Sequence, residues 1–321
     1  MNRARRAAIV GAGLAGLACA GELQRAGWQV VVFEKERTPG GRCATWSGPA
    51  GCFDHGAWCF TAASPEFAAR LSQWQTQGLV VESAGGWVGV PAMGRLPEAL
   101  AGDLALVSSC EVAGLDRIEG GWLVRTHQRL PEQIDPRFDA VVVALPSESA
   151  LPLVMSSDTL REAVRAVRSE PQWTVAAAWP VALPLKADVE GDGQAVLEVV
   201  RRDDLRPGRE RVPGVGCRWV LHAGTYWSAN NLDVPPHEVS RRLLAALSER
   251  AGLQLARPAY AAAHLWRHAR VPQPLAAPCG WDESLRLAVC GDAWHALPGA
   301  EGLERAWLSG QAAARHLDAS D

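Results

Sequence analysis

The chain has 321 residues, of which 48% are apolar and 21% are charged, the balance of an ordinary soluble globular protein. Its formal net charge of −3 indicates neither a nucleic acid nor an anionic membrane as a partner. The sequence has no apolar run of about eighteen residues, so we expect no transmembrane helix. The length suits one large or two moderate domains.

Residues 7–34 follow the order of a dinucleotide-binding unit: strand, glycine-rich turn, helix, strand and acid. We expect strands over residues 7–10 and 28–33, with a helix pattern between them that ends at Ala26. The turn residues are Gly11, Ala12, Gly13, Leu14, Ala15 and Gly16.

Each glycine of this turn has a physical task. Gly11 allows the tight turn, Gly13 lets a pyrophosphate approach the backbone, and Gly16 lets the helix pack close to the strand. The helix N-terminus then offers N–H groups to phosphate oxygens. Glu34, followed in its loop by Lys35, can accept hydrogen bonds from a ribose hydroxyl and repels a 2′-phosphate. FAD or NAD therefore fits this unit, and NADP does not.

Turns and short segments follow the second strand. Residues 38–42 form a turn that ends in the fixed cation of Arg42, and residues 46–60 read as a polar loop. We expect helices over residues 65–77 and 93–100, and an extended segment between them. Strand patterns then cover residues 104–107, 111–115, 122–126 and 140–144.

The pattern changes after residue 150. A short helix over residues 160–167 precedes apolar segments typical of antiparallel strands. The predicted strands cover residues 174–179, 195–200, 217–222 and 261–266. A predicted helix covers residues 236–251, before the last of these strands. A strand over residues 285–289, the loop Cys290-Gly291-Asp292 and a helix over residues 303–317 close the chain.

This order predicts an α/β fold, with a Rossmann-type FAD-binding domain and an inserted mixed α+β substrate domain. The first domain would comprise residues 1–75, 102–150 and 280–321, and the second residues 76–101 and 151–279. A single fingerprint and the closing Gly291-Asp292 segment favour FAD over NAD. A nicotinamide compound would then enter only as a transient substrate.

Eight cysteines are scattered without a CxxC pair, so we expect neither a redox dithiol nor a zinc site, and no other metal site. Free cysteines suit a reducing cytoplasm. The only lysines are Lys35 and Lys186.

Several short motifs are spread from residue 7 to the C-terminus: the glycine turn with Glu34, PGGR (39–42), FDHGA (53–57), VPAM (90–93), VLHA (220–223), LWRHA (265–269), and CGDA with WLSGQAAA (within 290–314). Together they resemble the renalase-like FAD-dependent oxidoreductases of the FAD-linked amine oxidase superfamily. The resemblance implies two domains, non-covalent FAD, and hydride transfer from dihydronicotinamide isomers to the flavin and then to oxygen.

The resemblance also implies roles for single residues. The glycine turn and Glu34 would hold the ADP half, Val112 would contact the adenine, and Gly41 with Arg42 would meet the pyrophosphate. The residues implied around the flavin are His55, Gly56, Ala57, Trp58, Gly291, Asp292, Leu303 and Glu304.

On the substrate side, the resemblance points to His222 as the catalytic residue. The candidate substrate-contacting residues are Trp58, Cys59, Trp266 and Arg267. As a neutral imidazole, His222 could donate a hydrogen bond to a substrate carbonyl, or it could be a buried strand histidine. Arg267 either supports the fold or faces an anionic group.

Two segments depart from the family pattern. Trp58-Cys59 stand where Gln-Tyr is usual, and Leu303-Glu304-Arg305-Ala306 where Val-Glu-Gly-Ala is common. The first change alters the wall beside the flavin. Amine oxidases of this superfamily commonly have a lysine near the flavin. No motif of this sequence places Lys35 or Lys186 there.

The leading hypothesis is therefore an FAD-dependent oxidase that takes hydride from a small reduced heterocycle. The alternatives are an FAD-dependent amine oxidase or desaturase, and a flavin-binding protein without turnover.

Overall fold

The computed structural model describes residues 4–83, 85–185 and 195–319. Its largest sheet has six strands in the order β16-β17-β11-β1-β2-β7, all parallel except β16, which is antiparallel to β17. This is the Rossmann-like arrangement that the sequence predicts. The strands are β1 (Arg6–Val10), β2 (Gln29–Phe33), β7 (Ala105–Val107), β11 (Ala140–Val143), β16 (Gly280–Asp282) and β17 (Leu287–Val289).

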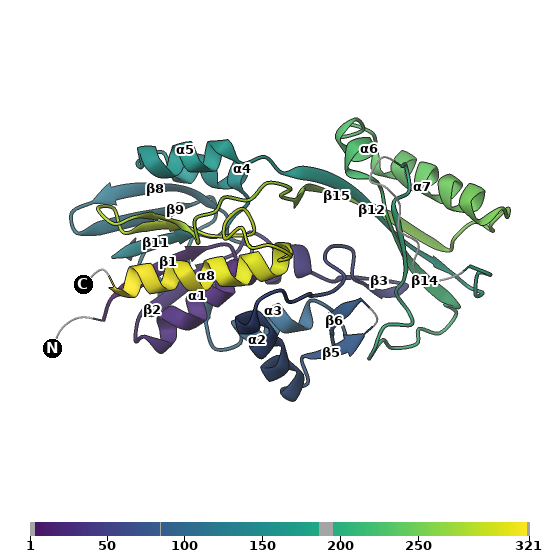
Figure 1. The fold of residues 1–321 in the computed structure, drawn as a ribbon, viewed down its shortest axis with the longest axis horizontal. Coiled ribbons are helices and arrows are strands. Elements are labelled where there is room, and N and C mark those ends of the chain that lie inside the picture. The colour runs from purple at the N-terminus through teal and green to yellow at the C-terminus, as the bar shows by residue number, and fades with distance from the viewer. Residues whose placement is uncertain (1–3, 84, 186–194, 320–321) are drawn as a thin grey trace.

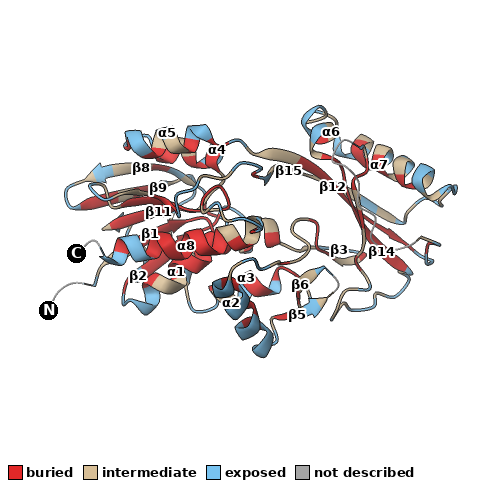
Figure 2. Cartoon of the chain, in the orientation of Figure 1, coloured by how far each residue is buried: buried red, intermediate tan, exposed pale blue. Residues whose placement is uncertain are grey.

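Helices α1 (Leu14–Arg25) and α8 (Gly302–Ala319) cover one face of this sheet, and both are largely buried (Figures 1 and 2). The two helices approach closely because Gly310 has no side chain. A Cβ atom at this position would overlap the carbonyl oxygen of Ala15. Alternate residues of β1, such as Ala7 and Ile9, point into this apolar layer.

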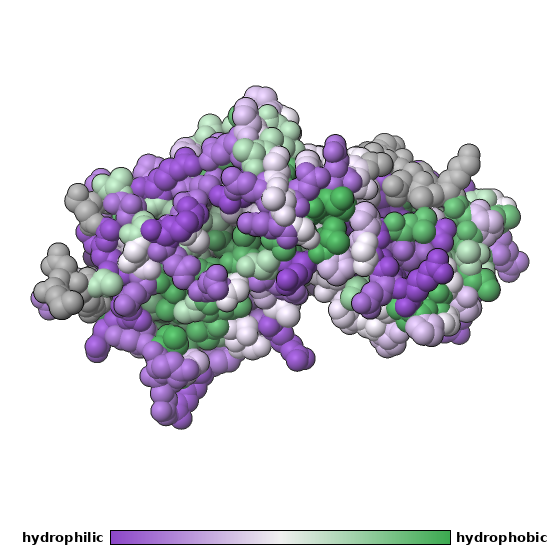
Figure 3. Space-filling model, turned by 90° about the horizontal axis from the view of Figure 1, so that it is seen from below, coloured by the Kyte–Doolittle hydropathy of each residue, from purple (hydrophilic) through white to green (hydrophobic). Residues whose placement is uncertain are grey.

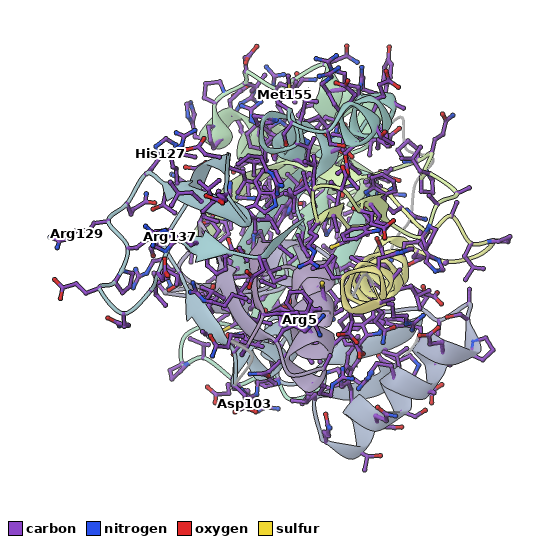
Figure 4. All side chains as sticks on the ribbon, turned by 90° about the vertical axis from the view of Figure 1, so that its left-hand side faces the viewer. Arg5, Asp103, His127, Arg129, Arg137 and Met155 are labelled. Atoms are coloured by element: carbon purple, nitrogen blue, oxygen red, sulfur yellow. The ribbon has the colours of Figure 1, made fainter. Side chains whose placement is uncertain are left out.

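The opposite face of the sheet is covered by a small antiparallel sheet and short helices. Figure 4 views this end of the molecule, where His127, Arg129 and Arg137 lie at the outer edge. The elements are β8 (Val112–Ile118), β9 (Gly121–Thr126), β10 (Arg137–Phe138), α4 (Ser147–Ala150), the 3-10 turn Leu151–Leu153 and α5 (Asp158–Ala166).

A four-stranded antiparallel sheet, in the order β13-β14-β12-β15, forms the other end of the molecule (Figure 1). Helix α7 packs on one face of this sheet through Val239, Leu243 and Leu247. The elements are β12 (Glu170–Trp179), β13 (Val199–Arg202), β14 (Cys217–His222), α6 (Thr225–Ala229), α7 (Pro236–Ala251) and β15 (Tyr260–Arg270).

Strands β12 and β15 are longer than the sequence pattern indicates. The predicted strands end at residues 174 and 266 on the side facing the nucleotide-binding part, whereas the paired strands continue to Glu170 and Arg270. These strand ends lack the alternation of apolar and polar residues that is typical of a strand. Hydrogen-bonded pairing between β12 and β15 keeps them extended. As a result, β15 carries Trp266 and Arg270 towards the nucleotide-binding part.

Residues 41–101 connect the two parts. The predicted loop over residues 46–60 is in part a hairpin of β3 (Trp46–Gly48) and β4 (Gly51–Phe53), so this part of the prediction is wrong. Packing of Phe53 under the four-stranded sheet stabilises it, which a local pattern cannot reveal. The remaining elements are the 3-10 turn Gly41–Cys43, α2 (Pro65–Thr76), β5 (Val80–Ser83), β6 (Gly86–Gly89) and α3 (Arg95–Ala101).

The sequence-based division gives residues 76–101 to the second domain. In the structure, Val80, Val88 and Leu96 of this segment share an apolar cluster with Leu14 of α1 and Trp307 of α8. The segment thus packs beside the dinucleotide unit.

Seen from below, hydrophilic side chains cover most of the outline of the molecule, and hydrophobic ones gather between them (Figure 3). Within the described ranges, no helix is long and apolar enough to cross a bilayer.

Candidate functional site

The predicted nucleotide residues gather at one edge of the parallel sheet. Strands β1, β2, β11 and β17 run in the same direction, so the residues that follow them lie at the same edge. This edge carries Gly11 after β1, Glu34 after β2 and Asp292 after β17. In open α/β sheets, ligands bind at the carboxyl ends of the strands.

The glycine turn has the backbone geometry that a pyrophosphate requires. Gly11 has φ +105°, and a Cβ atom at Gly16 would overlap the carbonyl oxygen of Gly11. Gly13 caps the N-terminus of α1, and a Cβ atom there would meet no protein atom within 4 Å. Its backbone therefore faces open space at the positive end of the helix, which fits a dinucleotide phosphate.

Glu34 is buried, with 7% of its surface exposed. Its carboxylate accepts hydrogen bonds from the backbone N–H of Ala12 (2.8 Å) and of Glu36 (2.9 Å). Burial raises the pKa of Glu34, and these two N–H donors oppose that rise. The acid is thus fixed beside the glycine turn, where its remaining lone pairs can accept ribose hydroxyls.

Arg42 and Asp292 form a bidentate ion pair, with both N–O distances at 2.6 Å. Asp292 is buried beside Gly302, at the start of α8, and the attraction of its carboxylate raises the pKa of Arg42 against the effect of burial. The backbone N–H of Ala57 donates to the carbonyl of Arg42 at 2.7 Å, so the loop of residues 55–57 docks on Arg42. The PGGR, FDHGA and CGDA motifs, which are distant in the sequence, are therefore in contact here.

A cleft of about 800 Å³ begins at this ion pair and extends to the end of the four-stranded sheet. It is large enough for a flavin ring and a small substrate. Of the predicted site residues, it is lined by Arg42, Gly56, Ala57, Trp58, Cys59, His222, Trp266, Asp292 and Leu303. A second cavity of about 740 Å³, between α7 and residues 255–261, contains none of them.

His222 lies at the end of β14 and is 7% exposed. One ring nitrogen, Nδ1, lies 3.2 Å from the hydroxyl of Thr174 on the neighbouring strand. Burial lowers the pKa of His222 to about 3, and the positive charges of Arg270 and Arg201 lower it further. His222 is therefore a neutral imidazole at physiological pH, with Nε2 left to contact a molecule in the cleft.

Trp58 is held by two arginines. The guanidinium of Arg201 lies 3.8 Å from the centre of the indole ring, and that of Arg206 lies 5.6 Å from it. Arg206 also donates a hydrogen bond to the backbone carbonyl of Trp58. Cation–π contacts of this kind fix an indole ring, so Trp58 forms a rigid wall of the cleft.

His55 and Trp266 stack with their ring centres 5.0 Å apart and an angle of 28° between them. The indole Nε1 of Trp266 donates to the carbonyl of His55 at 2.9 Å. Burial lowers the pKa of His55 to about 4, and His264 adds to this effect. The FDHGA loop is thereby attached to β15 next to the cleft.

Asp54 lies in a buried network of two carboxylates and two arginines. It pairs with Arg206 (3.1 Å) and Arg209 (2.6 Å), and Arg209 also pairs with Asp203 (3.1 Å). Asp54 further accepts from the backbone N–H of Met93 at 3.1 Å, which joins the FDHGA and VPAM segments. Asp54 is therefore a structural residue that holds the wall of the cleft.

Other predicted site residues lie away from the cleft. Arg267 is exposed, since it alternates with Trp266 along β15 and does not line the cleft. The carboxylate of Glu304 accepts from the backbone N–H groups of Ala63 (2.8 Å) and Ser64 (2.7 Å), which holds the start of α2.

Lys35 is exposed beside Glu36, and Lys186 lies outside the described residues. Val112 begins β8, two residues after Cys110, whose N–H donates to the carbonyl of Glu34 at 2.8 Å. Gly41 adopts φ +52° and lies against Gly13. Gly291 directly precedes Asp292, and its N–H donates to the hydroxyl of Ser309 at 3.2 Å.

The sequence did not single out five charged residues of the cleft: Glu170, Glu198, Arg201, Arg270 and Glu301. Arg270 comes directly after the LWRHA motif, so a longer estimate for β15 could have found it. Arg201 and Glu198 sit in a segment without any motif. Across the residues that the structure describes, no group of three or more His, Cys, Asp or Glu is placed to hold a metal ion.

Two family models match the chain. One describes an NAD(P)-binding Rossmann-like domain and matches residues 9–74, and the other describes flavin containing amine oxidoreductases and matches residues 60–318. A zeta-carotene-forming phytoene desaturase of Myxococcus xanthus is 54% identical over 42 residues, which cover 13% of this chain and 8% of the desaturase. The match therefore spans a small part of that protein.

Solved structures share the whole fold at low sequence identity. A proposed protoporphyrinogen oxidase from Exiguobacterium sp. 255-15 superposes with a TM-score of 0.71 at 11% identity, over 99% of this chain and 100% of the other. Cyclohexylamine oxidase from Brevibacterium oxydans IH-35A has a TM-score of 0.63 at 14% identity, over 98% of this chain and 99% of the other. A putrescine oxidase variant has a TM-score of 0.67 at 14% identity, over 99% and 100% of the two chains.

The open backbone at Gly13, the buried acid Glu34 and the cleft at Asp292 together fit FAD, the cofactor of this family. Since the second family model matches most of the chain, this protein belongs to the flavin containing amine oxidoreductases and is an FAD-dependent oxidoreductase.

Proposed function

We propose that this chain is a renalase-like oxidase that acts on a small, neutral reduced heterocycle such as a dihydronicotinamide isomer, with oxygen as electron acceptor. FAD, when bound, would accept the hydride and pass the electrons to oxygen. The chain's own residues bind and orient the substrate. The observation that carries the proposal is the buried, neutral His222 at the substrate end of the cleft, on which the charges of Arg201 and Arg270 act.

This environment disfavours a charged amine. A primary amine is an ammonium ion at neutral pH, and Arg201 and Arg270 would repel it near His222. The ring of Trp58 already holds the guanidinium of Arg201 at 3.8 Å, so this face of the ring is not available to a substrate ammonium. Four carboxylates from the described part of the chain line the cleft; of these, Asp292 is paired with Arg42, and Glu198 lies 3.8 Å from Arg270.

A neutral heterocycle suits the same residues. Trp266 offers a flat apolar surface on the wall of the cleft. Neutral His222, with Nδ1 beside Thr174, can direct Nε2 to a polar group of the substrate such as a carboxamide. In this proposal neutral His222 orients the ring for hydride transfer by a hydrogen bond and transfers no proton.

Rapid anaerobic mixing tests the substrate class. We expect dihydronicotinamide isomers to bleach the flavin of the FAD-loaded protein, and oxygen to restore its colour with release of hydrogen peroxide. Putrescine and cyclohexylamine serve as the comparison amines. Bleaching by an amine and not by any dihydronicotinamide would overturn the proposal.

An amine oxidase is the second candidate, because putrescine oxidase and cyclohexylamine oxidase share this fold. A desaturase has less support, since a long polyene needs an apolar tunnel and this cleft contains Glu170, Glu198, Arg201 and Arg270. A protein that binds FAD and is inert towards every reductant tested would instead indicate a flavin-binding protein without turnover.

A further inference from the structure

Arg305 lies near the N-terminal end of α8 and lines the cleft. Its guanidinium donates three hydrogen bonds to backbone carbonyls: to Asp292 through Nε (3.0 Å), to Ala300 (2.8 Å) and to Val271 (3.1 Å). All three acceptor residues also line the cleft. One side chain therefore connects three separate segments of the same wall.

The charge of Arg305 is not neutralised by a bonded carboxylate. Among the described residues, its hydrogen-bond acceptors are neutral carbonyls, and both oxygens of nearby Asp292 are taken by Arg42. Two guanidinium groups thus share one buried carboxylate, and the second acid at this wall, Glu301, is exposed to solvent.

Arg305 is half-buried, and a partly desolvated positive charge is costly unless a ligand compensates it. Burial lowers the pKa of Arg305, yet a guanidinium stays protonated in proteins. A dinucleotide brings two negative charges on its diphosphate, and its phosphate oxygens suit arginine donors. The charge of the Arg305 guanidinium is complementary to that of the FAD diphosphate.

We propose that Arg305 is a positioning residue for FAD, which fixes the wall at Val271, Asp292 and Ala300 and compensates the negative charge of the cofactor. The proposal rests on the FAD site described above and is independent of the substrate.

Titration of the FAD-free protein with FAD tests this role, with flavin fluorescence as the readout. We expect Arg305→Gln to raise the Kd for FAD on the order of tenfold, since both the charge and the planar set of donors are lost. Arg305→Lys keeps the charge but not the three donors, and we expect a smaller rise, roughly threefold. The control is Arg315→Gln on the same helix, whose partner Glu66 is half exposed, and its Kd should equal that of the parent.

Salt separates the electrostatic role from a purely structural one. The Kd of the parent should rise with salt more steeply than that of Arg305→Gln, because the variant lacks the compensating charge. An Arg305→Gln protein that folds and binds FAD as tightly as the parent would overturn the proposal, and so would an unchanged salt dependence. If Arg305→Gln does not fold, the Arg305→Lys protein decides: an unchanged Kd overturns the proposal, and a raised one supports it. A failure to oxidise dihydronicotinamides would touch only the proposed function.

Discussion

His222 is the single residue on which the proposed chemistry depends most. It is buried, neutral and bonded through Nδ1 to Thr174. We predict that His222→Gln lowers kcat/KM for the substrate on the order of tenfold, because one hydrogen bond to the substrate is lost or misdirected. The Kd for FAD should stay unchanged, and a weakened Kd would mean that His222 supports the cofactor instead.

The buried histidines predict a loss of stability in acid. The folded pKa is lowered to about 3 for His222 and about 4 for His55, below the ordinary value of 6.5. As the pH falls, the histidines of the unfolded chain are therefore protonated before those of the folded chain. Their contribution to the free energy of unfolding is highest above pH 6.5 and decreases as the pH falls below that value.

From near pH 7 to near pH 5, each such histidine should contribute roughly 2 kcal/mol of lost stability. Urea unfolding of the parent and of His222→Gln at both pH values measures the difference. The free energy of unfolding should fall less in the variant. Equal losses in the two proteins would contradict the assigned environment of His222.

Asp54 should matter for folding more than any exposed acid. Its side chain is fully buried between Arg206 and Arg209. We predict that Asp54→Asn lowers the free energy of unfolding by about 3 kcal/mol, because two buried guanidiniums lose a carboxylate partner. The matched control is Asp116→Asn, which breaks a half-exposed pair with Arg125 and should cost at most about 1 kcal/mol. Equal effects of the two substitutions in denaturant unfolding would contradict this assignment.

At the same scale, the sequence predicted many cleft residues but not their partners. Trp58, His222 and Asp292 follow motifs, so they could be named before the structure. Arg201, Arg206 and Asp203 come from a segment without a motif, and only the pairing of β13 with β14 brings them near residues 54–58. Contacts between distant segments of this kind are set by tertiary packing.

The contact between α1 and α8 gives a prediction at the scale of the elements. A Cβ atom at Gly310 would overlap the carbonyl oxygen of Ala15 and force the helices apart. We predict that Gly310→Ala lowers the free energy of unfolding by about 1–3 kcal/mol. In contrast, Gly21→Ala on α1 places its Cβ in open space and should stabilise the helix by about 0.5–1 kcal/mol. Chemical denaturation distinguishes the two, and the same sign for both would contradict the packing.

Elements with a strong periodic pattern could be predicted, and short ones could not. The predicted strand over residues 217–222 and the helix over residues 236–251 match β14 and α7. The hairpin of β3 and β4 was missed, because its strands have three residues each and are stabilised by packing against the four-stranded sheet. The length of β15 was underestimated for a related reason, since β12 holds its polar end.

At the scale of the whole molecule, the cleft lies between a nucleotide-binding sheet and a substrate-side sheet. The first supplies Asp292 from its carboxyl edge, where Arg42 pairs with it, and the second supplies His222 from the end of β14 and Trp266 from β15. The order of strands in the sequence predicted the first sheet. The meeting of the two sheets at one cleft depends on β12 and β15, whose full length the sequence did not reveal.

FAD should therefore stabilise the whole chain, and Gly13 offers a way to separate binding from folding. A Cβ atom at Gly13 meets no protein atom within 4 Å, and its φ of −74° is open to alanine. We predict that Gly13→Ala changes the unfolding free energy of the FAD-free protein by about 1 kcal/mol or less, the scale of a helix N-cap change.

The same methyl group would occupy the space into which the pyrophosphate must come. At an FAD concentration of about 100 times the parent's Kd, the parent should gain roughly 2.7 kcal/mol, and Gly13→Ala should gain much less. Thermal unfolding with and without FAD measures both quantities. NADP is the control ligand, since the buried carboxylate of Glu34 repels a 2′-phosphate, and it should stabilise neither protein. If FAD stabilised Gly13→Ala as much as the parent, the phosphates would not lie at the N-terminus of α1.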